Sequence, residues 1–385
     1  MKQVSVKNLL SYLIKYLSFS VLVLNSYLTT SYGNLPMLLF MLPYVWFMKV
    51  SFKLVDVCIL FTLAMIVIAA TLNSVVNGYH DVAFLKFSLY SITLASCISG
   101  FVRVHKFTTT QFIKALLFLL TLNSIFIVIT TLFPSSRVIY SIIAINPKVF
   151  TYPIPRYPGL VYDGFSYLSV FIILALTLCL VYHKKITNNV RSATASIASL
   201  ISMMGVLISG RLGMLLSLMF IPAWPKSIIF TQIIFLAVIA SCVSMFYADI
   251  FEVITHYVVW NLYQVVNIVF NGVSADTSSS DLFKNHFILG NENLPRLLFG
   301  SGDFGFGETA YTSDSGYIKV FNGLGFIGGT VFIFGVFALL FDRSLWMALF
   351  FLVFFIVMTK DFYLFFPYYF WSLSFFWLCT KSVKT

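Results

Sequence analysis

Charged side chains are scarce in this sequence. Asp, Glu, Lys and Arg make up 10% of the 385 residues, whereas hydrophobic residues make up 60%. Ordinary soluble domains carry about a quarter charged residues, so this composition predicts a membrane protein with many apolar spans. Acidic residues are the scarcest, because 13 Asp and Glu stand against 24 Lys and Arg and leave a net charge of +11. In such a chain a positive excess is typical of the inner side of a membrane, and we expect no nucleic-acid partner.

Several chemical motifs are also missing. The five cysteines lie in apolar runs and form no Cys-x-x-Cys pair, so we expect neither a disulfide framework nor a metal site. No cluster of His, Cys and Asp has the spacing of metal ligands, and no Gly-x-Ser-x-Gly elbow or phosphate-binding loop occurs. The segment Gly300-Ser-Gly-Asp-Phe-Gly305 matches G-x-G-x-x-G, but it lacks a preceding buried strand and more loop follows it. The sequence therefore predicts no metal and no cofactor.

The apolar runs predict an all-α fold, a polytopic membrane helical bundle of about twelve transmembrane helices, since about 17–25 residues cross a bilayer. We expect a single integral membrane domain over residues 1–385. No cleavable signal sequence is evident after the first run, so we expect that run to be retained as a span. The predicted spans are Leu9–Leu28, Leu35–Met48, Leu54–Val76, Val82–Val102, Phe112–Phe133, Phe165–Tyr182, Ala193–Ser209, Leu212–Trp224, Ser227–Tyr247, Tyr317–Phe341, Leu345–Met358 and Phe362–Cys379.

The distribution of Lys and Arg predicts the orientation of these spans. With the N-terminus inside, most basic residues fall on inner segments, as the positive-inside rule requires, and both termini are cytoplasmic. Two long loops then lie on the outer side, residues 134–163 and residues 248–313. The first part of the second loop carries Tyr257, Trp260 and Tyr263 at helical spacing, which predicts an interfacial helix. The two halves of the chain show no internal repeat, which argues against an inverted-repeat transporter.

A glycine-rich polar stretch at the end of the second outer loop is the strongest candidate for a functional site. It runs from Arg296 through a loop with several carboxylates into a helix that carries Gly323, Gly325 and Gly328. In a bilayer, irregular backbone is tolerated only where protein buries it or where it lines a watery cavity. We expect the helical glycines to let neighbouring helices approach closely and so to fix the start of this helix.

Three arginines on the predicted outer side have settings that favour phosphate binding. Arg156 lies in a proline-stiffened segment, Arg211 interrupts an apolar stretch at a span end, and Arg296 follows a proline before the glycine-rich loop. Charge at membrane depth is costly and commonly marks function, and a guanidinium matches phosphate oxygens with paired bonds. These arginines predict a pyrophosphate clamp. The alternative is that each snorkels to the interface or pairs with a nearby Asp.

Carboxylates and one histidine on the same side are able to take a proton from an attacking hydroxyl. Asp314 is the best placed, directly before a span, and Asp303 and Glu308 come next. His286 lies in the middle of the outer loop and is a weaker candidate, since a lone loop histidine is more often a surface residue. The alternative for each carboxylate is a helix N-cap or a solvated loop charge.

These segments resemble the O-antigen polymerase (Wzy) family and the related O-antigen ligases. The segments that carry the resemblance are Leu298-Phe-Gly-Ser-Gly302, Asp314-Ser-Gly-Tyr-Ile318, Gly323-x-Gly325-x-x-Gly328, Ser209-Gly-Arg211 and Arg156-Tyr-Pro-Gly-Leu-Val-Tyr-Asp163. The resemblance covers mainly residues 156–329. The ligases carry a His before the glycine-bearing helix where this chain has Asp314, and that departure favours a polymerase.

The resemblance implies a metal-independent glycosyl transfer at the periplasmic face of a bacterial inner membrane. A growing glycan leaves undecaprenyl pyrophosphate and joins the non-reducing end of a new lipid-linked repeat unit. The implied partners are that lipid-linked glycan, membrane lipid, and a flippase and a chain-length regulator of the same pathway. Asp314, Arg211 and Arg156 are then expected to be catalytic. The residues expected to bind substrate are Arg296, Asp163, Asp303, Glu308, Tyr317, Lys319 and His286.

Two alternatives stay open at this point. One is an O-antigen ligase, which would transfer the glycan to lipid A-core. The other is a flippase or exporter of polysaccharide, which would place charges inside the bundle near the middle of the membrane. The predicted spans are almost free of charge, and polar residues gather on the outer side, so a transferase is favoured.

Overall fold

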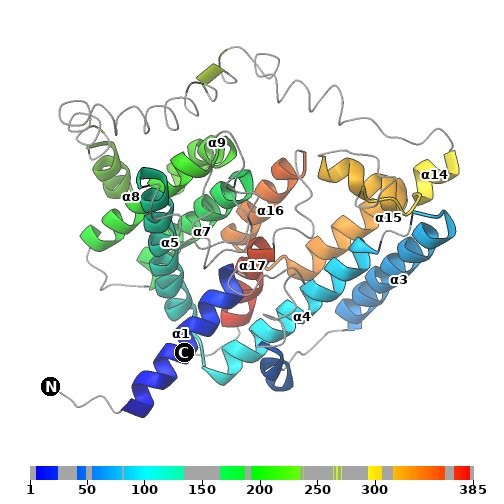
Figure 1. Ribbon diagram of the computed structural model, residues 1–385, viewed down its shortest axis with the longest axis horizontal. Helices are drawn as coiled ribbons and strands as arrows, with labels where there is room; N and C mark the ends of the chain where they lie inside the picture. The colour runs from blue at the N-terminus through cyan, green and yellow to red at the C-terminus, as the bar shows by residue number, and fades with distance from the viewer. Residues whose placement is uncertain are drawn as a thin grey trace. The chain divides into compact units, whose positions relative to one another are not determined.

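The computed structural model describes residues 6–24, 41–48, 54–79, 82–133, 165–186, 192–234, 294–305, 315–359 and 368–381, together with residues 237, 263, 266–267 and 270. Within these residues all regular structure is helical and no strand occurs (Figure 1). The predicted all-α fold class is therefore confirmed for this part of the chain. The predicted outer loop of residues 134–163 and most of the loop of residues 248–313 lie outside the described residues.

The helices follow the predicted apolar runs. Their bounds are α1 Val6–Leu24, η1 Leu42–Phe47, α3 Leu54–Val76, α4 Ala83–Val104, α5 Thr109–Leu132, α7 Phe165–Ile186, α8 Ser192–Ser209, α9 Arg211–Phe220, η4 Ile221–Ala223, α14 Leu294–Phe299, α15 Gly316–Leu340, α16 Leu345–Val357 and α17 Tyr368–Lys381. Four helical stretches among the described residues are long and apolar enough to cross a membrane: Leu54–Val76, Phe84–Val104, Thr109–Thr131 and Gly316–Leu340. The chain is thus a membrane-associated helical protein, and the count of about twelve spans stays a prediction.

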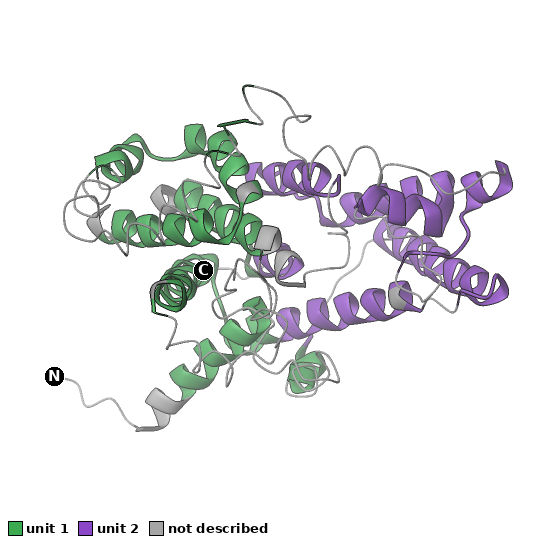
Figure 2. Cartoon of the chain, turned by 45° about the horizontal axis from the view of Figure 1, so that its top comes forward, with its two compact units in different colours: residues 1–47, 101–270, 379–385 green, residues 48–100, 271–378 purple. Residues whose placement is uncertain are grey.

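The chain divides into two compact units (Figure 2). Unit 1 comprises residues 1–47, 101–270 and 379–385, and unit 2 comprises residues 48–100 and 271–378. Each unit combines segments that are distant in sequence, so contacts between these segments hold it together, and local helix propensity alone would not produce it. That residues 1–385 form a single integral membrane domain stays a prediction.

Unit 1 is built around α7, whose side chains from Leu168 to Leu180 are almost completely buried. Helix α7 packs against α5, α8 and α9. Helices α5 and α8 also pack closely on each other, because a Cβ atom added at Gly205 on α8 would overlap Ser124 on α5. The backbone N–H of Gly213 on α9 donates to Ser169 Oγ on α7 at 3.1 Å. Close approach at small residues is the usual means by which helices pack in a bilayer, where no hydrophobic effect drives them together.

A polar cluster joins α1 to the turn between α4 and α5 in unit 1. Lys15 Nζ donates to His105 O at 3.3 Å and to Gln111 Oε1 at 3.1 Å, and Tyr44 Oη lies 3.0 Å from His105 Nε2. Gln111 also closes a capping box with Thr108 at the start of α5. Burial, and then the positive charge of Lys15, lower the pKa of His105 below its ordinary value. All of these segments belong to the predicted inner side, so their contacts agree with one common orientation.

Unit 2 packs α3 and α14 against α15. Gly335 on α15 is the point of close approach to α3, because an added Cβ atom would lie 2.9 Å from Leu63 Cδ2. The opposite face of α3 exposes large apolar side chains, including Leu54, Phe61 and Val76, which suits a surface in contact with lipid.

Aromatic side chains pack between the C-terminal helices α16 and α17 of unit 2. Trp371 on α17 packs on Phe350 and Phe354 of α16 with ring centroids 5.5 and 5.6 Å apart. Trp377 Nε1 donates to Asp342 Oδ2 at 3.0 Å, and the other oxygen of Asp342 accepts from the backbone N–H of Ser344 at the start of α16. The carboxylate of Asp342 thus holds Ser344, the N-cap residue of α16, whose Oγ accepts from Met347 N.

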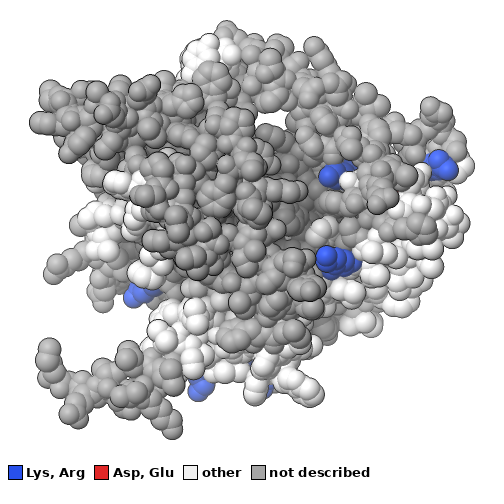
Figure 3. Space-filling view, viewed as in Figure 1, with Lys and Arg blue, Asp and Glu red and all other residues white. Residues whose placement is uncertain are grey.

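The described charged side chains do not form one continuous patch on the face shown in Figure 3. Lys and Arg side chains are visible there at separate places, between apolar and uncharged surface. Isolated cations at helix ends are what the positive-inside rule produces, whereas a nucleic-acid interface needs a basic stripe or patch.

Candidate functional site

Residues 300–305, which we call the glycine loop, fold inward within unit 2. Ser301, Gly302, Asp303 and Phe304 are buried, with the side chain of Phe304 fully enclosed. The loop directly follows α14, and Gly300 N donates to Arg296 O at 2.7 Å. Four of the six loop positions carry Gly or Ser, and this small size is what lets backbone pack against backbone. The polar stretch is therefore a packed element rather than a solvated connector.

The glycine loop docks on a break in α15. Gly325 has φ +71° in the middle of this helix, a conformation that L-residues rarely adopt. Ser301 N donates to Asn322 O at 2.7 Å, and Gly302 N donates to Gly323 O at 3.1 Å. Ser301 Oγ also donates to Asn322 O, at 3.0 Å. The carbonyls beside the break thus accept hydrogen bonds from the loop, which satisfies backbone groups that cannot be left unpaired inside a membrane protein.

The two segments fit because glycines face each other across the contact. A Cβ atom at Gly300 would overlap Gly323 O and Gly325 N, and a Cβ atom at Gly325 would overlap Leu298 O and Gly300 N. Each glycine is therefore required by the backbone of the other segment. This reciprocity explains the spacing of small residues in both motifs of the sequence.

The end of α3 forms the other wall of the glycine loop. Asn73 Nδ2 donates to Gly300 O at 2.9 Å, and Asn77 Nδ2 donates to Ser301 O at 2.9 Å. A Cβ atom at Gly302 would overlap the backbone of Ser74. The loop is thus held by α15 through its N–H groups and by α3 through its carbonyl groups.

Phe304 anchors the far end of the glycine loop. Its ring stacks on Phe84 of α4 with centroids 4.5 Å apart and planes 4° apart, and Phe84 also contacts Phe332 of α15 at 5.2 Å. Gly323 leaves the space for this ring, because an added Cβ atom there would overlap Phe304. Burial of these rings stabilises the docked loop by an apolar contact in addition to its hydrogen bonds.

Two buried polar side chains, Asp303 and Asn322, lie in this contact and are able to accept hydrogen bonds. Asp303 is 8% exposed, and its Oδ1 accepts from Gly305 N at 2.8 Å. Asn322 is 5% exposed, and its Oδ1 accepts no hydrogen bond from any described residue. A buried acceptor without a partner is uncommon in folded proteins and is able to accept one hydrogen bond from a water or a ligand hydroxyl.

Other predicted site residues lie on α14, α15 and α9. Arg296 is exposed on α14, directly before the glycine loop. Tyr317 and Lys319 are half-buried in the first turn of α15, where Tyr317 Oη donates to Phe355 O at 2.8 Å. Arg211 is the first residue of α9 in unit 1 and follows Gly210. Arg156, Asp163, His286, Glu308 and Asp314 lie outside the described residues.

The expectations for the start of α15 hold only in part. Its N-cap residue is Ser315, whose side chain makes no capping hydrogen bond, and the catalytic role of Asp314 stays a prediction. Gly323 and Gly325 were expected to admit neighbouring helices. Gly325 does admit one, because an added Cβ atom would overlap Leu298 O in the last turn of α14, whereas Gly323 admits the ring of Phe304. Gly328 meets only Leu324 of its own helix, at 3.3 Å, while the close helix contact falls at Gly335. The physical reason is the break at Gly325, which presents open backbone to the loop.

Sequence reasoning missed Asn73, Asn77 and Asn322. A signal for the first two was present, since they are polar residues four positions apart at the end of an apolar run and share one helix face. Their partners lie more than 220 residues away along the chain, so no local pattern identifies the contact. Asn322 stands among glycines in an apolar stretch and has no local pattern of its own.

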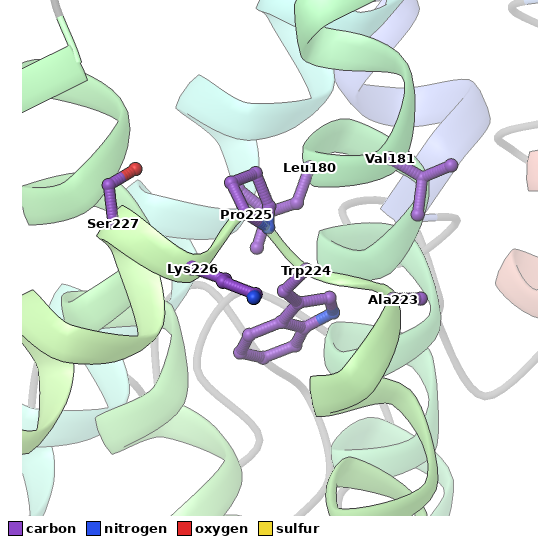
Figure 4. A pocket seen from close by; sticks show the side chains of 7 residues that line it. All are labelled: Leu180, Val181, Ala223, Trp224, Pro225, Lys226 and Ser227. Carbon is purple, nitrogen blue, oxygen red and sulfur yellow. The ribbon is translucent and has the colours of Figure 1, made fainter.

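A cavity of about 570 Å³ lies elsewhere, in unit 1 (Figure 4). It is lined by Leu180 and Val181 at the end of α7 and by residues 223–227, including Trp224 and Lys226. Trp224 is tied to α7, because its Nε1 donates to Thr177 Oγ1 at 3.2 Å. None of the predicted site residues lines this cavity, and its segments belong to the predicted inner side. It is therefore separate from the site proposed here.

Metal ligands do not cluster in the described part of the chain, which holds no group of three or more His, Cys, Asp or Glu placed to bind an ion. Among the described residues, the cysteines Cys58, Cys97, Cys179 and Cys379 are thiols and form no disulfide. Comparison with protein-family models, with curated proteins and with solved structures finds no match for this chain.

Proposed function

We propose that this protein is an O-antigen polymerase, a glycosyltransferase that elongates a lipid-linked glycan at the outer face of a bacterial inner membrane. The observation that carries the proposal is the glycine loop docked on the broken helix α15. Two of the five sequence segments that resemble the polymerase family, residues 298–302 and residues 323–328, meet in this contact. A resemblance carried by two segments that pack together is stronger support than two isolated motifs.

The reaction needs no cofactor in this proposal. A hydroxyl oxygen of the acceptor sugar forms a bond to the anomeric carbon of the donor glycan, and the bond from that carbon to the pyrophosphate oxygen breaks. The pyrophosphate leaves with the electron pair, and the hydroxyl proton passes to a base. The protein therefore has to supply positive hydrogen-bond donors for the charge that develops on the leaving group and a carboxylate or histidine for the proton.

We assign these tasks to the predicted residues. Arg156, Arg211 and Arg296 bind the pyrophosphate, and Asp314 is the base or orients it. The described geometry supports a binding role for Arg296, because its exposed side chain is held one turn before the glycine loop. Asp303 is a weaker candidate for the base, since its carboxylate is buried and already accepts from the loop backbone.

Location and orientation are part of the same proposal. The end of α3, the first half of α15 and the glycine loop meet within unit 2, which supports placing them on one side of the membrane. The basic-residue asymmetry assigns that side to the periplasm and both termini to the cytoplasm. A flippase and a chain-length regulator would be partners of the same pathway.

Deleting the gene and separating the surface glycan on a gel tests the proposal. A polymerase predicts that lipid A-core survives with a single repeat unit attached, because one unit is still transferred to it by a separate ligase. Complete loss of surface glycan, with polymer retained on its lipid carrier, would instead identify a ligase. An unchanged ladder would contradict both activities.

A further inference from the structure

Two amides, Asn73 in the last turn of α3 and Asn77 directly after the helix, hold the glycine loop by its carbonyl groups. Asn73 Nδ2 donates to Gly300 O, and Asn77 Nδ2 donates to Ser301 O, each at 2.9 Å. The two side chains are also joined to each other, because Asn77 Nδ2 donates to Asn73 Oδ1 at 2.8 Å. The end of α3 and the turn that follows it thus present a connected pair of amides to two successive peptide groups of the loop.

The geometry makes this contact different from an ordinary surface hydrogen bond. The loop N–H groups of Ser301 and Gly302 are bound to α15, so the amides of α3 complete its hydrogen bonding from the opposite side. Gly302 lies so close to α3 that an added Cβ atom would overlap the backbone of Ser74, which leaves the loop no room to shift toward this helix. The loop therefore has one position along α3, and Asn73 and Asn77 define it.

We propose that Asn73 and Asn77 are positioning residues of the site. They fix the glycine loop, and through it they fix Arg296, whose carbonyl accepts from Gly300 N at 2.7 Å, and Asp303 within the loop. Helix α3 carries no predicted site residue, yet it sets the geometry of the segment that carries Arg296 and Asp303. The effect on glycan transfer rests on the proposed polymerase function, whereas the effect on the loop does not.

The substitution Asn77→Asp tests this with little change of shape. The carboxylate lacks the N–H groups and would face two acceptors, Ser301 O and Asn73 Oδ1. Hydrogen exchange measured on the full-length protein in nanodiscs should show about tenfold faster exchange of the Ser301 and Gly302 amides, since losing one such bond changes a local equilibrium by that order. Polymer made by a deletion strain that carries this variant should shorten or disappear at normal protein level.

Two further variants separate positioning from a general loss of stability. Thr71→Val removes an intrahelical bond to Val67 O on the same helix without touching the loop, so loop exchange and polymer should both stay as in the wild type. Gly302→Ala displaces the loop by overlap with Ser74 rather than by loss of an amide. The double variant Asn77→Asp with Gly302→Ala should then be no worse than the more severe single variant, because both act on one position of the loop.

Unchanged exchange of the loop amides in both Asn77→Asp and Asn73→Asp would overturn the positioning role. Faster exchange with a normal polymer would overturn its importance for transfer. If Asn77→Asp speeds hydrogen exchange throughout unit 2, the variant has lost stability in general. The exchange of the loop amides in Asn73→Asp then decides the positioning role, because this variant leaves the bond from Asn77 to Ser301 intact. A wild-type protein that makes no polymer would contradict the proposed function, and the exchange measurement would still decide the role of the two amides.

Discussion

Arg211 stands at an unusual point of the chain, as the first residue of α9 directly after the extended backbone of Gly210. If its guanidinium binds pyrophosphate through two parallel bonds, a lysine cannot replace it, because an ammonium is a point charge. We expect Arg211→Lys to lower the rate of polymerisation by roughly a hundredfold, the usual loss when one donor to a developing anion is removed. Glycan ladders at matched protein level measure this.

A matched control comes from Arg103, which donates to Phe47 O on the predicted inner side. Arg103→Lys keeps the charge and should leave the ladder unchanged. A wild-type ladder from Arg211→Ala would contradict the clamp.

Substitution of Asp314 and of His286 tests which of the two side chains takes the proton. Asp314→Asn should abolish long chains at unchanged protein level, because the amide cannot accept the acceptor hydroxyl proton. His286→Ala should be mild. The reverse ranking, with His286→Ala inactive and Asp314→Asn active, would indicate a ligase-like histidine mechanism and would move the site.

The sequence identified which segment of the chain forms the candidate site, but it did not identify all the residues that hold this segment in place. Arg296, Asp303 and the loop glycines could be selected because a polar, glycine-rich stretch before a span is conspicuous in an apolar chain. Asn73 and Asn77 could not, since their meaning depends on a loop far away in sequence. Hydrogen bonds of this kind are set by tertiary packing, and no residue pattern encodes their partners.

Among the helices, α15 is the one whose conformation depends most on its neighbours. The break at Gly325 requires positive φ and no Cβ atom. Gly325→Ala should lower the free energy of unfolding by about 2 kcal/mol or more, because an L-residue held at φ +71° and ψ 173°, a region essentially restricted to glycine, alone costs about 1–3 kcal/mol and the methyl group would also overlap Leu298 O. Thermal unfolding in detergent, with the glycan ladder as a second readout, measures this.

Gly328→Ala is the matched control within the same helix. Its Cβ atom would meet only Leu324 Cβ at 3.3 Å, and alanine favours a helix over glycine by about 1 kcal/mol. This variant should unfold no earlier than the wild type. Equal destabilisation by both substitutions would contradict the view that the loop contact, rather than the helix interior, requires glycine.

Helix positions were predictable because composition changes sharply at their ends. Helix α3 begins and ends at the predicted residues, since Lys53 precedes its apolar run and Gly78, at φ +77°, closes it with a turn. The predicted run from Leu35 to Met48 fared differently, because its described part forms the 3-10 helix η1. The break in α15 could not be predicted, since a glycine in an apolar run fits a straight helix equally well.

The topology of the whole chain is a separate prediction. A cysteine at position 279, introduced by Ser279→Cys in the long predicted outer loop, should react with a membrane-impermeant thiol reagent when only the outer membrane is permeabilised. The basic-residue asymmetry is the reason, because it assigns residues 248–313 to the periplasmic side. The wild-type protein is the control for reaction at its five native cysteines. Labelling that requires a broken inner membrane would reverse the orientation and move the site to the cytoplasm.

The most direct test of the account is elongation by the purified full-length protein in phospholipid vesicles, supplied only with undecaprenyl-pyrophosphate-linked repeat units. We predict that the lipid-linked glycans lengthen by whole repeat units, that one undecaprenyl pyrophosphate is released for each addition, and that a metal chelator leaves the rate unchanged. Repeat units that stay single in these vesicles, but are transferred when lipid A-core is added, would contradict the account and identify a ligase.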